Sequence, residues 1–253
     1  GHGLVSYSSQ LFLIAGYNGS KYLNDVWRSG NGATWTQATA EAGFSKRYGA
    51  ACAAFDDGLS QKLWLIGGVA GASYNNEIWN SSDGAAWTLA GHAAFSSREA
   101  AVILKYKSKL WIMGGLAAGG GYRNDVWSSA DGITWTQVTA EASFSPRYRH
   151  AGTVFHNQMW ITGGYDGANT LNDAWSSTDG INWTKAAGAM FSTREGHCAQ
   201  GAWNAKGLGA LTWGDCGLSL PKGAGSCKHQ ENRKGKGIQP SGRENQGNDC
   251  GGV

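Results

Sequence analysis

A unit of about fifty residues repeats four times along the chain, and this repeat limits the possible folds more than any other feature. Each unit contains two tryptophans that lie eight positions apart. The pairs are Trp27 and Trp35, Trp79 and Trp87, Trp127 and Trp135, and Trp175 and Trp183. A fixed period of this length is typical of repeat architectures, in which each unit is one supersecondary element that packs on the next.

Two further patterns share this period. One is Phe-x-x-Arg, and its arginines are Arg47, Arg98, Arg147 and Arg194. The other is an apolar run that ends in two small residues. Its copies are LFLIAG (11–16), LWLIGG (63–68), LWIMGG (110–115) and MWITGG (159–164). Three patterns with one period argue against chance similarity, and a β-solenoid of the same period is the competing architecture.

Each unit reads as four short strands. In the last complete unit they are 150–156, 158–162, 171–176 and 182–186, because apolar and polar residues alternate there between turn residues. A Ser-x-Asp-Gly or Ser-x-Asn-Gly turn separates strands three and four in every unit. Asp-Gly and Asn-Gly supply the positive φ angles of a tight hairpin, so we interpret this turn as structural.

These motifs resemble kelch repeats: an arginine before strand one, a double glycine after strand two, Asn-Asp-x-Trp on strand three and a tryptophan on strand four. The segment DVWSSADGITWTQV (125–138) is similar to kelch-like proteins of bacterial envelopes and secretomes. The resemblance covers residues 1–203, with Ala15-Gly16 in place of the double glycine in the first unit. It implies an all-β chain of propeller blades, each a four-stranded antiparallel sheet with strand one nearest the axis.

The expected domain is a propeller of four blades plus the first strand of a fifth. The boundaries are 1–45, 46–96, 97–145 and 146–192 for the blades and 193–203 for the partial fifth. Such an array is an open arc or a small ring, and we expect it to be part of a larger, extracytoplasmic or secreted bacterial polypeptide. The motif LWxxGG does not follow Lys206, and residues 204–253 are rich in Gly, Lys and Asn. We interpret them as a disordered extension or as a frame-shifted tail.

Charge separates these two parts of the chain. The formal excess of +3 lies in residues 204–253, whereas residues 1–203 are formally neutral. Phosphate binding needs a concentrated basic face, so a neutral propeller argues against nucleic acid as the partner. No apolar run approaches the roughly 18 residues of a membrane-spanning helix.

The loops that follow strand two and the loops that enter strand one emerge on the same face. In the kelch family this face, at the mouth of the central channel, is the usual binding surface. Its candidate ligand-binding residues are Tyr17, Arg47, Tyr48, Arg98, Arg147, Tyr148, Arg149, Tyr165 and Arg194. The four repeated arginines also fit a structural role, because one occurs in every unit. The residues that differ between units, Tyr17, Arg149 and Tyr165, are therefore the better ligand candidates.

The sequence favours a binding module that recognises a protein segment or a carbohydrate at the propeller mouth. The alternatives are a fragment of a sialidase-like or galactose-oxidase-like enzyme and a structural spacer. No GxSxG, Walker or HExxH motif occurs, so we assign no catalytic residue. Three histidines recur at one repeat position, His2, His150 and His197. Three imidazoles around a channel could bind a metal, but we expect each to pack or hydrogen-bond at the start of an inner strand, and we expect no metal or cofactor.

Overall fold

The computed structural model describes residues 1–188, 191–203 and 209–214, and the described chain consists of β-strands and connecting loops without helices. The chain divides into two units, Gly1–Ser219 and Leu220–Val253, and every described residue belongs to the first. The expected tail, 204–253, lies outside the described residues except for 209–214.

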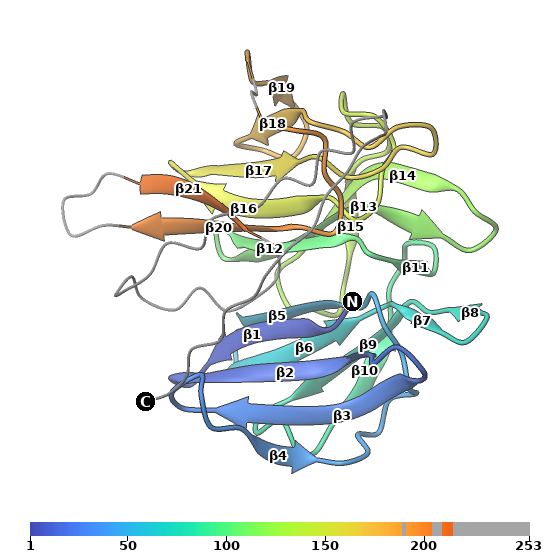
Figure 1. Cartoon of the computed structure of the whole chain (residues 1–253), viewed down its shortest axis with the longest axis vertical. Coiled ribbons are helices and arrows are strands. Elements are labelled where there is room, and N and C mark those ends of the chain that lie inside the picture. The colour runs from blue at the N-terminus through green and yellow to red at the C-terminus, as the bar shows by residue number, and fades with distance from the viewer. Residues whose placement is uncertain (189–190, 204–208, 215–253) are drawn as a thin grey trace, which may run out of the picture. The chain divides into compact units, whose positions relative to one another are not determined.

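Four antiparallel sheets follow one another along the chain and are arranged as a four-bladed propeller (Figure 1). Blade 1 consists of β1 (Gly3–Tyr7), β2 (Gln10–Tyr17), β3 (Tyr22–Ser29) and β4 (Thr36–Thr39). Blade 2 consists of β5 (Ala51–Asp56), β6 (Gln61–Ile66), β9 (Glu77–Ser81) and β10 (Thr88–His92). Its β6–β9 loop carries a small hairpin of β7 (Val69–Ala70) and β8 (Ser73–Tyr74).

The third and fourth blades repeat the same order. Blade 3 consists of β12 (Val102–Tyr106), β13 (Lys109–Ala117), β14 (Tyr122–Ser129) and β15 (Thr136–Thr139), and the short β11 (Arg98–Glu99) pairs with the end of β13. Blade 4 consists of β16 (Ala151–Phe155), β17 (Gln158–Thr162), β18 (Ala174–Ser177) and β19 (Thr184–Lys185). The sequence-based prediction of four four-stranded blades is confirmed.

A fifth unit follows with two strands rather than the single strand that the sequence suggested. β20 (Cys198–Trp203) pairs antiparallel with β21 (Gly209–Gly214), from Cys198 opposite Gly214 to Trp203 opposite Gly209. Strand β21 lacks the LWxxGG motif. Because the ladder is made by backbone groups, a second strand forms without that motif.

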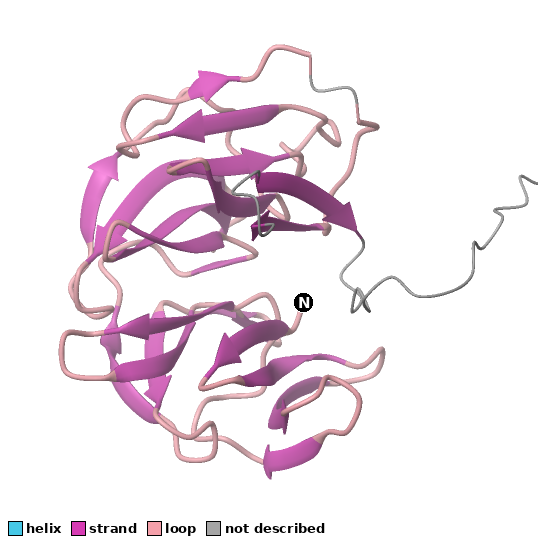
Figure 2. Cartoon of the chain, turned by 90° about the vertical axis from the view of Figure 1, so that its left-hand side faces the viewer, coloured by secondary structure: helices cyan, strands magenta, loops and turns pink. Residues whose placement is uncertain are grey.

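The first strands of successive blades lie side by side. β1 contacts β5, β5 contacts β12, β12 contacts β16 and β16 contacts β20. The sheets therefore follow one another around a common centre, as Figures 1 and 2 show. This arrangement brings the loops of different blades together at the mouth.

The hydrophobic core lies between neighbouring blades. Three clusters of buried side chains fill the junctions of blades 1 and 2, 2 and 3, and 3 and 4. At each junction the phenylalanine of Phe-x-x-Arg packs edge-on against a tryptophan of the next blade: the ring centroids of Phe95 lie 5.8 Å from Trp127 and 5.5 Å from Trp135. Edge-to-face contacts of this kind add about 0.5–1.5 kcal/mol to the burial of each ring.

The Ser-x-Asp-Gly turns are structural, as expected. In blade 3 the Ser129 hydroxyl accepts the Gly132 N–H at 2.8 Å, and one Asp131 carboxyl oxygen accepts the N–H groups of Ile133 and Thr134. The indole N–H of Trp135 donates to the Gly132 carbonyl at 3.1 Å. A Cβ at Gly132 would lie 2.8 Å from the ring of Trp64 in blade 2, and the turn glycines of blades 2 and 4, Gly84 and Gly180, meet rings of the preceding blade in the same way.

No helix of the described residues has the length and apolar character needed to cross a membrane.

Candidate binding surface

The repeated arginines join the blades instead of facing solvent. The Arg98 side chain is 2% exposed and donates to both carboxyl oxygens of Asp125, at 2.6 and 2.8 Å, and to the Gly114 carbonyl at 3.0 Å. Its backbone N–H donates to Asn75, and its carbonyl accepts the Gly68 N–H. Arg98 therefore joins the two blades: its backbone bonds to blade 2, and its side chain and the β11–β13 pairing hold it to blade 3.

The same clamp occurs at the two other junctions. Arg47 is fully buried and pairs with Glu77 and the Gly67 carbonyl. Arg147 is also buried and pairs with both oxygens of Asp173. Three of the sequence-based ligand candidates therefore lie beneath the surface: Arg47, Arg98 and Arg147. Their guanidinium groups are held by strong hydrogen bonds to carboxylates and backbone carbonyls. This placement favours the structural role that their regular spacing also suggested.

Arg194 occupies the equivalent position after blade 4 and differs from the other three. It is partly exposed, and its guanidinium donates to the carbonyl and the hydroxyl of Ser192, both at 3.1 Å. The side chains of the fifth unit that would complete a clamp lie outside the described residues.

Two residues after each arginine, the backbone forms a chain of hydrogen bonds around the mouth. The N–H of Gly196 donates to the Arg149 carbonyl, Arg149 to Ala100, Ala100 to Gly49, and Gly49 to Gly1. Gly49, Ala100, Arg149 and Gly196 all have φ between 51° and 68°. Glycine adopts this left-handed conformation freely, whereas Ala100 and Arg149 hold it at an expected cost of about 1–3 kcal/mol each.

Tyrosines gather in two groups on this face. In the first group the ring centroids of Tyr22 and Tyr48 lie 5.4 Å apart and nearly parallel, and Tyr17 lies 5.3 Å from Tyr22. Tyr17 is 52% exposed. The three residues come from blade 1 and from the loop that enters blade 2, so this group lies across a blade junction.

The second group repeats this arrangement at the junction of blades 3 and 4. The rings of Tyr122, Tyr148 and Tyr165 pack edge-on with centroid separations of 5.5, 6.0 and 6.1 Å. The structure thus brings the sequence-based tyrosine candidates together in two pairs, Tyr17 with Tyr48 and Tyr148 with Tyr165. Tyr22 and Tyr122 were missed, although both stand two residues before the Asn-Asp of strand three.

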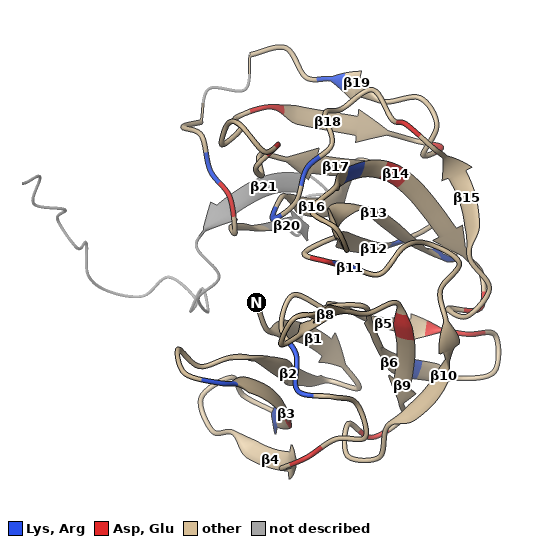
Figure 3. Ribbon diagram, turned by 90° about the vertical axis from the view of Figure 1, so that its right-hand side faces the viewer, with Lys and Arg blue, Asp and Glu red and all other residues tan. Residues whose placement is uncertain are grey.

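Arg149 is an exposed arginine of this surface. Its side chain is 43% exposed; the guanidinium carbon lies 4.9 Å from the centroid of the Tyr148 ring, and one guanidinium nitrogen lies 3.8 Å from a Glu195 carboxyl oxygen. Elsewhere the charged residues are spread over the sheets (Figure 3). Arg149 therefore joins the second tyrosine group as a cation available to a ligand.

Glu99 is the buried carboxylate of the mouth, and sequence reasoning did not select it. It occupies the repeat position of Tyr48 and Tyr148 and is 5% exposed. Its Oε2 atom is buried and has no hydrogen-bond partner among the described residues. Burial raises the pKa of Glu99, whereas a hydrogen bond from Tyr48 and the charge of Arg149 act in the opposite direction.

Two of the recurring histidines, His150 and His197, are buried, whereas His2 is exposed. His150 is buried, and desolvation, followed by the charge of Arg147, lowers its pKa to about 3. One ring nitrogen of His197 lies 3.1 Å from the Thr162 hydroxyl. In the part of the chain that the structure describes, no group of three or more His, Cys, Asp or Glu residues could hold a metal ion.

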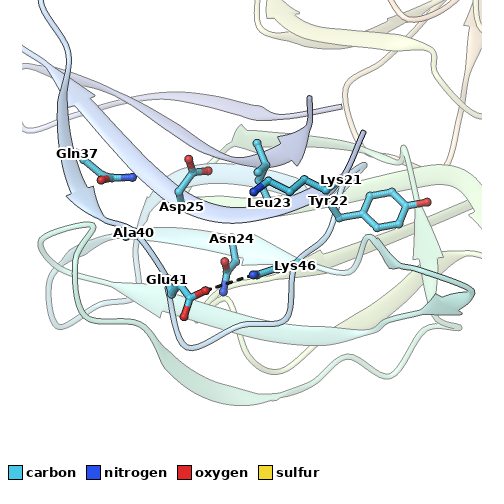
Figure 4. Close-up of a pocket in the computed structure, with 9 residues that line it drawn as sticks. All are labelled: Lys21, Tyr22, Leu23, Asn24, Asp25, Gln37, Ala40, Glu41 and Lys46. Carbon is cyan, nitrogen blue, oxygen red and sulfur yellow. Dashed lines mark ion pairs between the residues drawn. The ribbon is translucent and has the colours of Figure 1, made fainter. Parts of the chain in front are cut away.

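A hollow lies in blade 1 beside β3 and the chain that follows β4 (Figure 4). Its lining residues are Lys21, Tyr22, Leu23, Asn24, Asp25, Gln37, Ala40, Glu41 and Lys46. The Asn24 amide donates to the carbonyls of Ala42 and Phe44, and Lys46 pairs with Glu41 at 3.2 Å on the exposed rim. The Asn24 contacts hold the chain that follows β4 against β3, so we assign this hollow a structural role.

Radial four-stranded blades, paired tryptophans and a buried arginine clamp at each junction define a kelch-type β-propeller. In agreement, the family model of the Kelch motif matches residues 146–176, which contain Arg147, the double glycine and Trp175. The motif match covers one repeat unit, and together with the four-bladed arrangement it supports a kelch-repeat propeller. A comparison with curated protein sequences finds no match.

Proposed function

We propose that the chain is a kelch-type interaction module that binds a segment of a partner protein across the loops of the mouth. The observation that carries the proposal is the pair of tyrosine groups, Tyr17 with Tyr22 and Tyr48, and Tyr122 with Tyr148 and Tyr165. Tyrosine and arginine dominate the binding energy of protein interfaces, because they present rigid, amphipathic contact area.

The scaffold supports this function. Both groups lie across a blade junction, where the buried arginine clamps and the edge-on Phe–Trp contacts fix the loops relative to one another. A surface that is ordered before binding loses little entropy when a ligand docks. The exposed Arg149 adds a group for carboxylates or backbone carbonyls of the ligand.

The test is a displayed library of linear peptides panned against the protein, followed by affinity measurement for the selected peptide. We expect Tyr165→Ala to weaken binding at least tenfold, which corresponds to about 1.4 kcal/mol. Leu59→Ala is the matched control, because Leu59 is 89% exposed but lies in the β5–β6 turn, outside the mouth loops. Equal losses in the two variants, or selection of no peptide, would contradict the proposal.

Carbohydrate is the second candidate, because the exposed ring of Tyr17 offers a flat face on which a sugar could stack. A glycan array probed with the same protein separates the two ligands. Glycan binding that is lost in Tyr17→Ala, in the absence of a selected peptide, would assign the surface to carbohydrate. Binding of neither class would leave the structural spacer, or a fragment of a larger propeller enzyme, as the role of the chain.

A further inference from the structure

We propose that the mouth contains a pocket for a positively charged side chain, a lysine of the bound segment, with Glu99 as its anion and tyrosine rings as its wall. This inference rests on the proposed function and names the ligand chemistry that the surface selects.

The first observation is the position of Glu99. The residue lies where the other units place Tyr48, Tyr148 and the exposed Glu195, beside the backbone chain at the centre of the mouth. A Cβ on Gly49 would lie 2.9 Å from the Glu99 Oε2 atom. The carboxyl group therefore lies over the backbone of the neighbouring blade and does not extend to the rim.

The second observation is that this carboxyl is incompletely paired. Glu99 is 95% buried, and its Oε2 atom has no hydrogen-bond partner in the described chain. Buried carboxylates are almost always paired, because an unpaired buried charge costs several kcal/mol. A ligand cation supplies the missing partner and offsets the burial that raises the pKa of this group.

The third observation is the aromatic wall. Tyr48, Tyr74 and Tyr148 are each partly exposed, and each has its pKa raised by burial with a further contribution from the Glu99 charge. They come from three different loops. Tyr48 also hydrogen-bonds to the Glu99 carboxylate. Tyrosine rings beside a carboxylate suit an ammonium group, because the ring faces attract a cation and the lysine stem packs on their edges.

Two cations of the chain also act on Glu99, the Gly1 ammonium group and Arg149, but neither donates a hydrogen bond to its Oε2 atom. Arg149 has partners of its own. Its guanidinium stacks on Tyr148 and lies 3.8 Å from Glu195. Its charge therefore stays at the exposed side of the mouth, and the buried Oε2 atom of Glu99 remains without a donor.

The experiment titrates the protein with N-acetyl-lysine methylamide and with N-acetyl-norleucine methylamide, which has the same stem without the charge. Binding is followed by NMR of tyrosine ring protons. We expect the lysine compound to bind at least tenfold more tightly than the norleucine compound, and we expect Glu99→Gln to abolish this preference. Glu41→Gln, a change at an exposed carboxylate in the chain that follows β4, is the matched control.

A stability measurement guards against a variant that fails to fold. Glu99→Gln keeps the shape and removes the buried charge, so its midpoint of urea unfolding should equal or exceed that of the parent protein. Equal binding of the two compounds, or a lysine preference that survives in Glu99→Gln, would overturn the inference. If a selected peptide binds without such a preference, the pocket is wrong and the proposed function stands. If the lysine compound binds with the expected preference but no peptide or glycan binds, the pocket stands and the proposed function is wrong.

Discussion

At the scale of single residues, the double glycine after strand two allows neighbouring blades to approach. A Cβ on Gly114 would lie 2.7 Å from His150 Cε1 and 3.0 Å from the Arg147 carbonyl, both in the segment that begins blade 4. A Cβ on Gly115 would lie 2.7 Å from the Glu99 carbonyl. The first glycine thus makes room for the next blade, and the second makes room for strand one of its own blade.

Gly114→Ala should destabilise the protein by about 2–4 kcal/mol. The new methyl group meets the His150 ring and the Arg147 carbonyl, and alanine is strained at φ +66°. Gly119→Ala is the control, because φ there is +84° but nothing lies within 4 Å of the added Cβ. The loss in free energy of unfolding of Gly119→Ala measures the backbone strain alone and should stay near 1 kcal/mol. Urea unfolding followed by tryptophan fluorescence compares the two, and similar losses would show that close approach has no effect.

His150 should make the stability of the protein depend on pH. Its pKa is about 3 in the folded chain and 6.5 in the unfolded chain, so the unfolded chain binds more protons between these values. The stabilisation is complete above pH 6.5 and is lost as the pH falls towards 3. The slope from this one group approaches 1.4 kcal/mol per pH unit.

The measurement compares free energies of unfolding at several pH values between 7.5 and 4.5. His150→Ala should flatten the dependence, and alanine is the residue that blades 2 and 3 carry here, at Ala50 and Ala101. The exposed His92→Ala is the control. A slope that is the same in His150→Ala and in the parent protein would show that His150 becomes protonated without unfolding.

At the scale of the element, each arginine clamp joins a loop of one blade to the second and third strands of the next. Asp125→Ala leaves the Arg98 guanidinium buried without its carboxylate and should destabilise the protein by about 3–5 kcal/mol. Glu41→Ala breaks the exposed pair with Lys46 and should change stability by less than about 1 kcal/mol. Chemical denaturation checks both values, and a loss at Asp125 no larger than that at Glu41 would rule out the clamp as a main stabilising contact.

The strands and turns were predictable from the sequence because they depend on local patterns. Alternating apolar residues and Ser-x-Asp-Gly turns repeat in each unit, and the structure confirms the four strands of every blade. The short β7, β8 and β11 were not predictable, because no repeated pattern marks them: β7 and β8 pair with each other within one loop of blade 2, and β11 pairs with the end of β13.

The site was less predictable for a related reason. Regular spacing suggested that Arg47, Arg98 and Arg147 are structural, but their partners Glu77, Asp125 and Asp173 lie 26 to 30 positions away in sequence. The tyrosine groups combine residues of two blades. The burial of Glu99 depends on Gly49 of another unit, so no local pattern distinguishes Glu99 from the exposed Glu195.

At the scale of the whole molecule, stability is shared between neighbours, because the core clusters and the clamps lie at the junctions and not inside single sheets. In such arrays each unit is stabilised chiefly by its immediate neighbours. Weakening the junction of blades 2 and 3 should therefore separate the unfolding of the two halves. We expect Asp125→Ala to broaden the urea transition and lower its m-value, in addition to shifting its midpoint.

Amide hydrogen exchange gives an independent reading of this prediction. Strands on the two sides of the weakened junction should exchange at different rates in Asp125→Ala and at similar rates in the parent protein. A transition that stays as steep as that of the parent, with uniform exchange, would mean that the described blades unfold as one unit in spite of the weakened junction.

The left-handed backbone of Arg149 bears on how such a surface diversifies. Glycine fits this position best, and Gly49 and Gly196 occupy it in other units. A larger residue there holds the left-handed conformation at a cost in folding free energy of about 1–3 kcal/mol. The backbone hydrogen bonds at this position are the same whether the residue is Gly49, Ala100, Arg149 or Gly196. The side chain at the mouth can therefore differ from unit to unit while the blades beneath it keep their structure.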